Sequence, residues 1–187
     1  MGIALLAVTT VELDPGRAAL VLVDLMPRII ALPTQPFSGV DVMRRCLALA
    51  AALRSAGGLV VFVRAERPGV DAQPPGSGLA AECEPQPGDV QIVKRTLGAF
   101  HDTGLDGVLR SRGIHTVVLG GLVTNFGVES TGRAADEHGY SVVFVSDAMA
   151  GLHGHAHTFA VEYIFPRLGA VCTSAELMAA AADPPVA

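Results

Sequence analysis

Residues 18–24, AALVLVD, decide the fold of this chain. Six apolar residues run without interruption between the turn-forming segment Asp14-Pro15-Gly16 and the polar residue Asp24. An unbroken aliphatic and β-branched run bounded by turn residues is typical of a strand that is buried on both faces. Ala18–Val23 is therefore predicted to be the central strand of a parallel sheet.

Strand and helix patterns alternate along the rest of the chain. Apolar residues at helical spacing over Val40–Ser55 are followed by the strand pattern Leu59–Val63, which makes a βαβ unit. Further strands are predicted at Val90–Lys94, Thr116–Leu119, Ser141–Val145 and Ala170–Cys172, and further helices at Leu105–Arg112, Val128–His138 and His155–Tyr163. This alternation predicts an α/β fold, a doubly wound, Rossmann-like parallel sheet with helices on both faces, in one domain over residues 1–187. The Pro- and Gly-rich segment Arg67–Asp89 is too long for an ordinary connection and is predicted to be a binding loop.

Composition excludes several classes of partner. The formal charge of -5 and the absence of a Lys/Arg run longer than two argue against binding to nucleic acid or to an anionic membrane surface. Apolar runs fall short of the roughly 18 residues of a membrane span. Three scattered cysteines without a CxxC motif favour reduced thiols, so we expect a soluble, cytoplasmic protein. The mean hydropathy of +0.46 is high for a small monomer, and we expect a homodimer or homotetramer.

Polar residues follow three of the predicted strands. Asp24 ends the first strand, Lys94 ends the strand Val90–Lys94, and Thr124 and Asn125 open a strand-to-helix turn that contains Gly127. The carboxyl ends of parallel strands meet at one edge of a sheet, where ligands bind in doubly wound folds. Each residue also has a purely structural interpretation: a cap for Asp24, a solvated strand end for Lys94, and a turn at positive φ for Gly127.

In order and spacing, four segments resemble the isochorismatase-like hydrolase superfamily, which includes nicotinamidases and other cysteine amidohydrolases. They are ALVLVDLM (19–26), VKRTLGAFHDTGLDGVLRSRGI (93–114), GLVTNFGVESTGRAADEHGY (121–140), and SVVFVSDAMAG (141–151) followed by His157. The resemblance implies that Asp24 and Lys94 are the catalytic pair and that Gly127 stands where the family has its nucleophilic cysteine. It also implies a non-proline cis peptide at Leu122–Val123 that helps to shape an oxyanion site.

Two subgroups of this superfamily carry glycine at the nucleophile position. True isochorismatases cleave a vinyl ether, with the aspartate as general acid and water completing the release of pyruvate. The TNxxVEST frame of residues 124–131 is more similar to a bacterial subgroup of unassigned activity that is related to the cysteine enzymes. We predict that Phe100, Leu122, Val123, Thr124 and Asn125 bind the substrate.

No metal or other cofactor is expected. Nicotinamidases place Asp-x-His after the second strand, whereas this chain has VRAERP at residues 63–68. His153 and His157 share a helical face, but that spacing arises freely near a helix start, and zinc binding there is disfavoured. His101 is a further pocket candidate, and Arg64, Arg67 and Arg95 are candidates for a carboxylate clamp.

Two functions remain open from the sequence. The first is a metal-independent hydrolase that uses Asp24 and Lys94, without a cysteine nucleophile, on a small polar metabolite. An anionic substrate would help to protonate Asp24 by drawing Lys94 away from it, whereas an ionised Asp24 would serve as a base. The second is a non-catalytic small-ligand-binding or assembly protein that retains the hydrolase fold.

Overall fold

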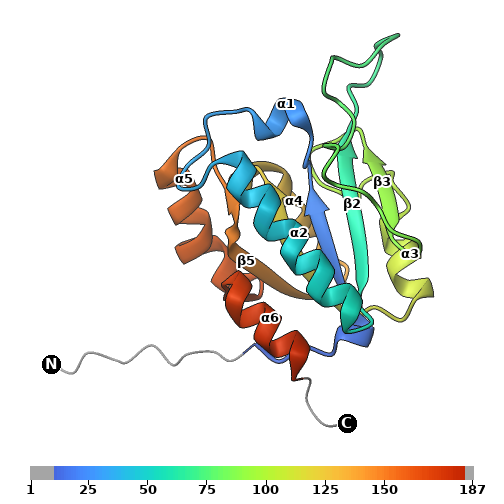
Figure 1. The fold of residues 1–187 in the computed structure, drawn as a ribbon, viewed down its shortest axis with the longest axis vertical. Coiled ribbons are helices and arrows are strands. Elements are labelled where there is room, and N and C mark those ends of the chain that lie inside the picture. Colours follow the sequence, from blue (N-terminus) through green and yellow to red (C-terminus); the bar gives the residue numbers. More distant parts are fainter. Residues whose placement is uncertain (1–10, 184–187) are drawn as a thin grey trace, which may run out of the picture.

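The computed structural model describes residues 11–183, in which six strands form one parallel sheet (Figure 1). The strands are β1 (Ala18–Val23), β2 (Leu59–Ala65), β3 (Val90–Lys94), β4 (Thr116–Leu122), β5 (Ser141–Ala150) and β6 (Ala170–Cys172). Their order in the sheet is β3-β2-β1-β4-β5-β6. All residues of β1 are buried, and β1 pairs with β2 on one side and β4 on the other, which confirms its predicted central place.

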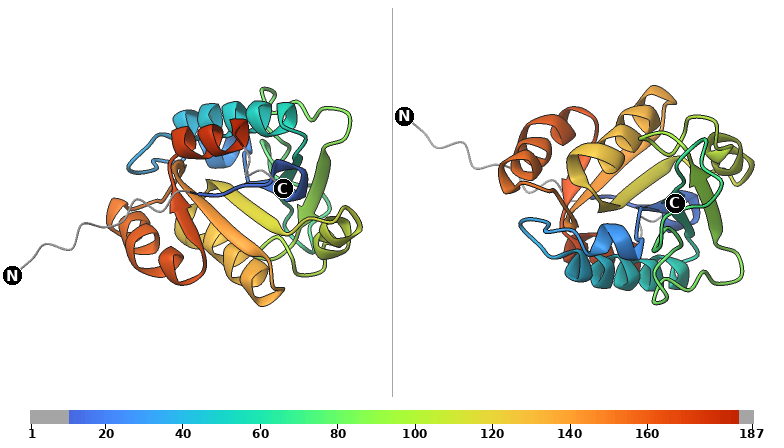
Figure 2. Two further views of the ribbon diagram at one scale, coloured as in Figure 1. Left: turned by 90° about the horizontal axis from the view of Figure 1, so that it is seen from below. Right: turned by 90° about the horizontal axis from the view of Figure 1, so that it is seen from above.

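Helices cover both faces of the sheet, which confirms the predicted doubly wound fold (Figure 2). The helices are α1 (Pro27–Ile30), α2 (Gly39–Ser55), α3 (Leu105–Ser111), α4 (Glu129–Glu137), α5 (Gly154–Phe159) and α6 (Ser174–Ala182). Residues of α2 and α6 share one apolar core with the sheet, and residues of α3 and α4 share the core on the opposite face.

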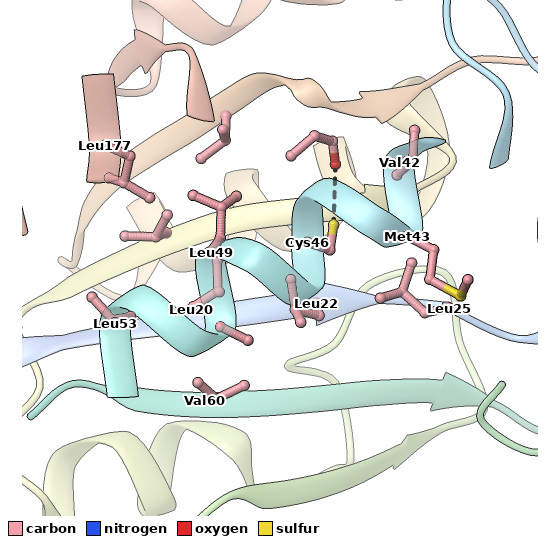
Figure 3. Packing of buried hydrophobic residues seen from close by; sticks show 14 of the residues in the cluster. Leu20, Leu22, Leu25, Val42, Met43, Cys46, Leu49, Leu53, Val60 and Leu177 are labelled. Carbon is pink, nitrogen blue, oxygen red and sulfur yellow. Dashed lines mark hydrogen bonds between the residues drawn. The ribbon is translucent and has the colours of Figure 1, made fainter. Parts of the chain in front are cut away.

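The packing of α2 follows from its apolar spacing. Val42, Cys46, Leu49 and Leu53 recur at helical intervals and are buried, and Figure 3 shows α2 crossing the sheet with these side chains packed against it. Each fully buried Val or Leu side chain contributes about 1.5–3 kcal/mol relative to exposure. The Sγ atom of Cys46 donates to the Ala148 carbonyl at 3.4 Å, so this thiol is part of the core.

Two strands extend beyond their predicted ends. Thr116–Leu119 continues to Leu122, and Ser141–Val145 continues to Ala150. The prediction for β4 stopped early because glycines interrupt its apolar pattern. Gly121 is required there, because its φ is +113° and a Cβ would lie 2.2 Å from the Val23 carbonyl oxygen. The extra residues carry β4 past the end of β1 and toward the site.

The predicted helices also differ at their ends. The predicted helix Val128–His138 is preceded by a π-helical turn, Thr124–Val128, and the predicted helix His155–Tyr163 changes from α5 into a second π-helical segment, Ala160–Ile164. The short helix α1 and the terminal helix α6 were not predicted. The capping box of Thr173 and Glu176 at the start of α6 is a sequence signal for that helix.

The strand order places a topological switch point between β1 and β4. Connections leave these neighbouring strands in opposite directions, so a crevice opens beyond their carboxyl ends. The predicted binding loop lies between β2 and β3, and it contacts α1 through the Arg28 N–H, which donates to the Gly76 carbonyl at 3.3 Å. Within residues 11–183, the helices are all too short or too polar to cross a membrane.

Candidate active site

Asp24 and Lys94 form a buried ion pair at the carboxyl edge of the sheet. Lys94 Nζ lies 2.8 Å from Asp24 Oδ2, and the exposed fractions of the two side chains are 2% and 13%. Nζ also donates to the Leu97 carbonyl at 2.7 Å, which leaves one of its three protons for another acceptor. Lys94 is the only lysine of the chain. Strands β1 and β3, separated by β2, thus bring together two residues that are 70 positions apart.

Burial dominates the electrostatics of Asp24. Loss of hydration raises the pKa of Asp24 above its usual 3.8, while Lys94 and, at longer range, Arg28 act to lower it. The second carboxylate oxygen, Oδ1, is buried and accepts no hydrogen bond from the described residues. Asp24 itself has a φ of 53°, and its N–H donates to the Val63 carbonyl of β2 at 2.8 Å, which holds the residue at the end of β1.

Gly127 lies directly against this pair. A Cβ at this position would be 3.0 Å from Lys94 Nζ and 3.4 Å from Asp24 Oδ2. The φ of Gly127 lies outside the left-handed region, so the interpretation of Gly127 as a glycine required for positive φ is wrong. The Gly127 carbonyl accepts from Thr131 Oγ1 at 2.6 Å, one turn further along, and this bond anchors the turn to α4. The absence of a side chain therefore affects chemistry rather than backbone geometry.

The turn after β4 combines a cis peptide with a π-helical turn. The Leu122–Val123 bond is cis, as the resemblance implied, and Thr124–Val128 follows it. Within the turn, the N–H groups of Phe126 and Val128 donate to the Val123 carbonyl at 3.1 and 3.4 Å, so the turn begins directly after the cis peptide. The Thr124 hydroxyl lies 2.9 Å from His157 Nδ1 in a buried contact, which ties the turn to α5.

Within residues 11–183, no group of three or more His, Cys, Asp or Glu side chains is placed to hold a metal ion. The His153 and His155 rings stack on each other at 5.7 Å, while His157 is engaged with Thr124. His157 is buried, and burial lowers its pKa below 6.5, which favours the neutral ring. Of these three histidines, His157 therefore supports the turn after β4.

The isochorismatase domain model matches residues 18–176. The chain belongs to the isochorismatase family. The uncharacterized isochorismatase family protein YwoC of Bacillus subtilis is 37% identical over 186 residues, which cover 90% of this chain and 96% of YwoC. An isochorismatase family protein from Burkholderia thailandensis has a solved structure with 42% identity and a TM-score of 0.85, covering 91% of this chain and 98% of that one.

An enzyme with a named activity has the same fold. N-carbamoylsarcosine amidase from Thermoplasma acidophilum is 26% identical, with a TM-score of 0.71, and the match covers 84% of this chain and 96% of that one. By sequence and fold, the present chain is an isochorismatase-family hydrolase.

Of the predicted substrate-binding residues of this family member, four lie in or beside the turn. Leu122 and Val123 form the cis peptide, Thr124 is buried against His157, and Asn125 has a buried Oδ1 without a partner among the described residues. The structure does not bring Phe100 to the pair, because its ring stacks on His138 at the far end of α4, with centroids 5.1 Å apart.

The other polar candidates are engaged elsewhere or exposed. Arg64 and Arg95 both pair with Glu66, at 2.7 and 3.2 Å, and Arg67 is exposed. His101 is also exposed, with 71% of its side chain accessible, and it lies 3.3 Å from Asp102. The structure therefore does not assemble a carboxylate clamp from these arginines.

Arg28 is the residue that sequence reasoning missed. It lies on α1, four residues after Asp24, and its charge acts on that carboxylate. Its Nε atom is buried, and within residues 11–183 its side chain makes no ion pair or hydrogen bond. The sequence did hold a signal for Arg28, because it lies only four residues after Asp24, at the end of the central strand where ligands are expected to bind.

Proposed function

We propose that this isochorismatase-family chain is a metal-independent hydrolase that cleaves a small polar metabolite without a covalent enzyme intermediate. The position of Gly127 carries the proposal. The point that a side chain would occupy at Gly127 lies 3.0 Å from an ammonium nitrogen and 3.4 Å from a carboxylate oxygen. A water molecule beside this point would have both a proton acceptor and an orienting donor within reach.

The proposed chemistry uses Asp24 as a general base. Asp24 removes a proton from the water, and the resulting hydroxide adds to the electrophilic carbon of the substrate. Lys94 and the N–H groups of the turn stabilise the negative charge that develops on the substrate oxygen. When the bond to the leaving group breaks, the proton held by Asp24 passes to that group. A raised Asp24 pKa favours this role, because a base works best when its pKa approaches the working pH.

The substituted position defines the proposed subgroup, in which glycine replaces the cysteine nucleophile of related hydrolases. Amide or carbamoyl C–N cleavage is the favoured reaction, because the matched N-carbamoylsarcosine amidase is named for it and the fold is shared. Vinyl ether cleavage, with Asp24 as acid, is the competing reaction and requires the protonated carboxyl group. The two reactions release different products and predict opposite pH profiles.

A substrate panel that reads both ammonia and pyruvate tests this function. Asp24→Asn and Lys94→Met should each lower any measured kcat by roughly 100-fold or more, the range expected for loss of a general base or of an oxyanion donor. Asp102→Asn is the matched control, because Asp102 has the same φ of 53° but a side chain that is 90% exposed. It should leave the rate unchanged.

The pH profile assigns the role of Asp24. As a base it must be ionised, so kcat should rise with pH through a pKa above 3.8. A rate that instead falls through that pKa would identify an acid and favour vinyl ether cleavage. Equal rates in wild type and both site variants would remove the pair from the mechanism. Ligand binding without any turnover would favour the non-catalytic small-ligand-binding or assembly protein.

A further inference from the structure

Four buried polar side-chain atoms of residues 11–183 lack a hydrogen-bond partner, and their arrangement points to a ligand. They are Asp24 Oδ1, Arg28 Nε, Ser77 Oγ and Asn125 Oδ1. Buried polar atoms in folded proteins are nearly always paired, because an unpaired one loses its hydration without compensation. A concentration of such atoms in one region is therefore a feature that a bound polar molecule would explain.

All four atoms come from segments that leave the carboxyl ends of the central strands. Asp24 and Arg28 follow β1, Ser77 lies in the connection after β2, and Asn125 lies in the turn after β4. The connection after β2 is held against the segment after β1 by two backbone bonds. Arg28 N–H donates to the Gly76 carbonyl at 3.3 Å, and Ala80 N–H donates to the Leu25 carbonyl at 2.9 Å. The residue next to Gly76 is Ser77, which is 5% exposed.

The chemistry of the atoms divides them into two pairs. Arg28 Nε is a donor and the Ser77 hydroxyl can donate, and both are carried by the contact between α1 and the loop after β2. Asp24 Oδ1 and Asn125 Oδ1 are acceptors. Asp24 contacts the point at Gly127 through its other oxygen, and Asn125 lies two residues before Gly127 in the turn after β4. The first pair suits an oxyanion, and the second pair suits N–H groups.

Charge favours an anion at the first pair. Lys94 already neutralises Asp24, so the additional guanidinium of Arg28 leaves this region with a net charge of +1 when all three groups are ionised. Arg64 and Arg95, which also lie near strand ends, both have a carboxylate partner, because they pair with the two oxygens of Glu66. A partly buried guanidinium without a carboxylate partner is a strong site for a carboxylate, because charged hydrogen bonds are stronger than neutral ones.

We propose that the substrate is a ureido or amide acid whose carboxylate binds Arg28 and Ser77 while its N–H groups bind Asn125. This inference rests on the proposed function for the identity of the bond that is cleaved. It assigns specificity to Arg28, a residue that does not take part in the bond-breaking step. The separation of Arg28 from the reaction point at Gly127 then selects the length of the substrate between its carboxylate and the bond that is cleaved.

A pair of probes that differ only in charge tests the assignment. N-carbamoyl-β-alanine carries a carboxylate, and N-carbamoyl-β-alaninamide replaces it with a neutral amide. Calorimetric titration gives Kd for each probe, and KM replaces Kd where a probe is hydrolysed. The wild-type protein should bind the acid roughly 10-fold or more tightly than the amide, the scale of a charge-assisted hydrogen bond.

Arg28→Gln should remove this preference by weakening binding of the acid, with little change for the amide. Ser77→Ala should reduce it by a smaller factor. Arg112→Gln is the control for net charge, because Arg112 is an exposed residue that follows α3 and precedes β4, at the opposite edge of the sheet. If Arg28→Gln does not fold by circular dichroism, Arg28→Lys provides the test, since it keeps the charge but loses the planar donor group and should bind the acid more weakly.

The outcomes separate this inference from the proposed function. Equal binding of acid and amide by wild type, no binding of the acid at millimolar concentration, or a preference that survives Arg28→Gln would overturn the role of Arg28. Hydrolysis of the neutral amide alone would support the proposed function and refute this inference. Arg28-dependent binding of the acid without hydrolysis of either probe would support the anion site and count against the hydrolase.

Discussion

Gly127→Cys should place a thiol beside the Asp24–Lys94 pair and thereby restore a nucleophile to the site. The backbone accepts a side chain here, because φ of Gly127 lies outside the left-handed region. The new Cβ would meet Lys94 Nζ and Val23 Cγ1, both at 3.0 Å, whereas relaxed carbon contacts lie at about 3.5–4.0 Å. The lysine end can move, but Val23 is fixed in the central strand.

The expected loss of stability is small. Overpacking costs about 1–3 kcal/mol, and replacement of a glycine in helical backbone returns about 0.5–1 kcal/mol. A net loss of about 1 kcal/mol should lower the melting temperature by roughly 2–4 °C for a domain of this size. Gly127→Ala is the matched control, since it adds the same Cβ without the sulfur. Both variants should also lose the wild-type hydrolysis, because the Cβ displaces the proposed water.

The chemical effect distinguishes the cysteine variant from the alanine control. Lys94 and the start of the helical segment 124–137 both favour a thiolate, so the new thiol should titrate roughly 1–2 units below 8.5. Its alkylation rate against pH, followed by intact mass, measures that pKa, and short amides and activated esters report any acyl transfer. A folded variant whose thiol titrates near 8.5 or resists alkylation, with no hydrolysis above Gly127→Ala, would refute the view that the pair still activates a nucleophile.

Three further predictions concern the pH dependence of stability, the native thiols and assembly. Folding raises the pKa of Asp24, so the folded state holds this proton more tightly than the unfolded state does. The unfolding free energy of wild type relative to Asp24→Asn should therefore fall as pH rises from 3.8 through the folded pKa. A difference in unfolding free energy that is constant over that pH range would contradict the raised pKa. Iodoacetamide should modify the native cysteines slowly and leave any activity intact, because burial raises their pKa values, to about 11 for Cys83 and about 12 for Cys172. Rapid inactivation that tracks the modification of one cysteine would instead reveal a displaced nucleophile. Light scattering should give a dimer or tetramer mass across micromolar concentrations, and a mass of 19.3 kDa throughout would exclude the homo-oligomer.

The site divides into residues that the sequence could place and residues that it could not. Asp24, Lys94 and the turn around Gly127 all lie at or just after the carboxyl ends of strands, so a parallel sheet was enough to bring them to one edge. Phe100 and His101 have no such constraint, since they lie in an irregular segment between β3 and α3. Their side chains point where packing allows, and the ring of Phe100 is used to cover α4 rather than the site.

Local sequence determined the elements of this protein, because short apolar runs and helical spacing report burial directly, and six strands were predicted from them in the correct order along the chain. The carboxyl ends of β4 and β5 were not predicted, and in β4 the apolar pattern breaks at glycines, of which Gly121 is required by the close approach of Val23 in β1. Only the tertiary structure decided the 2.8 Å contact of Asp24 with Lys94 and the lack of a partner for Arg28 Nε within residues 11–183. Those properties depend on distances between segments far apart in the chain, and the desolvation that sets the charge of Asp24 exists only once the whole sheet has packed.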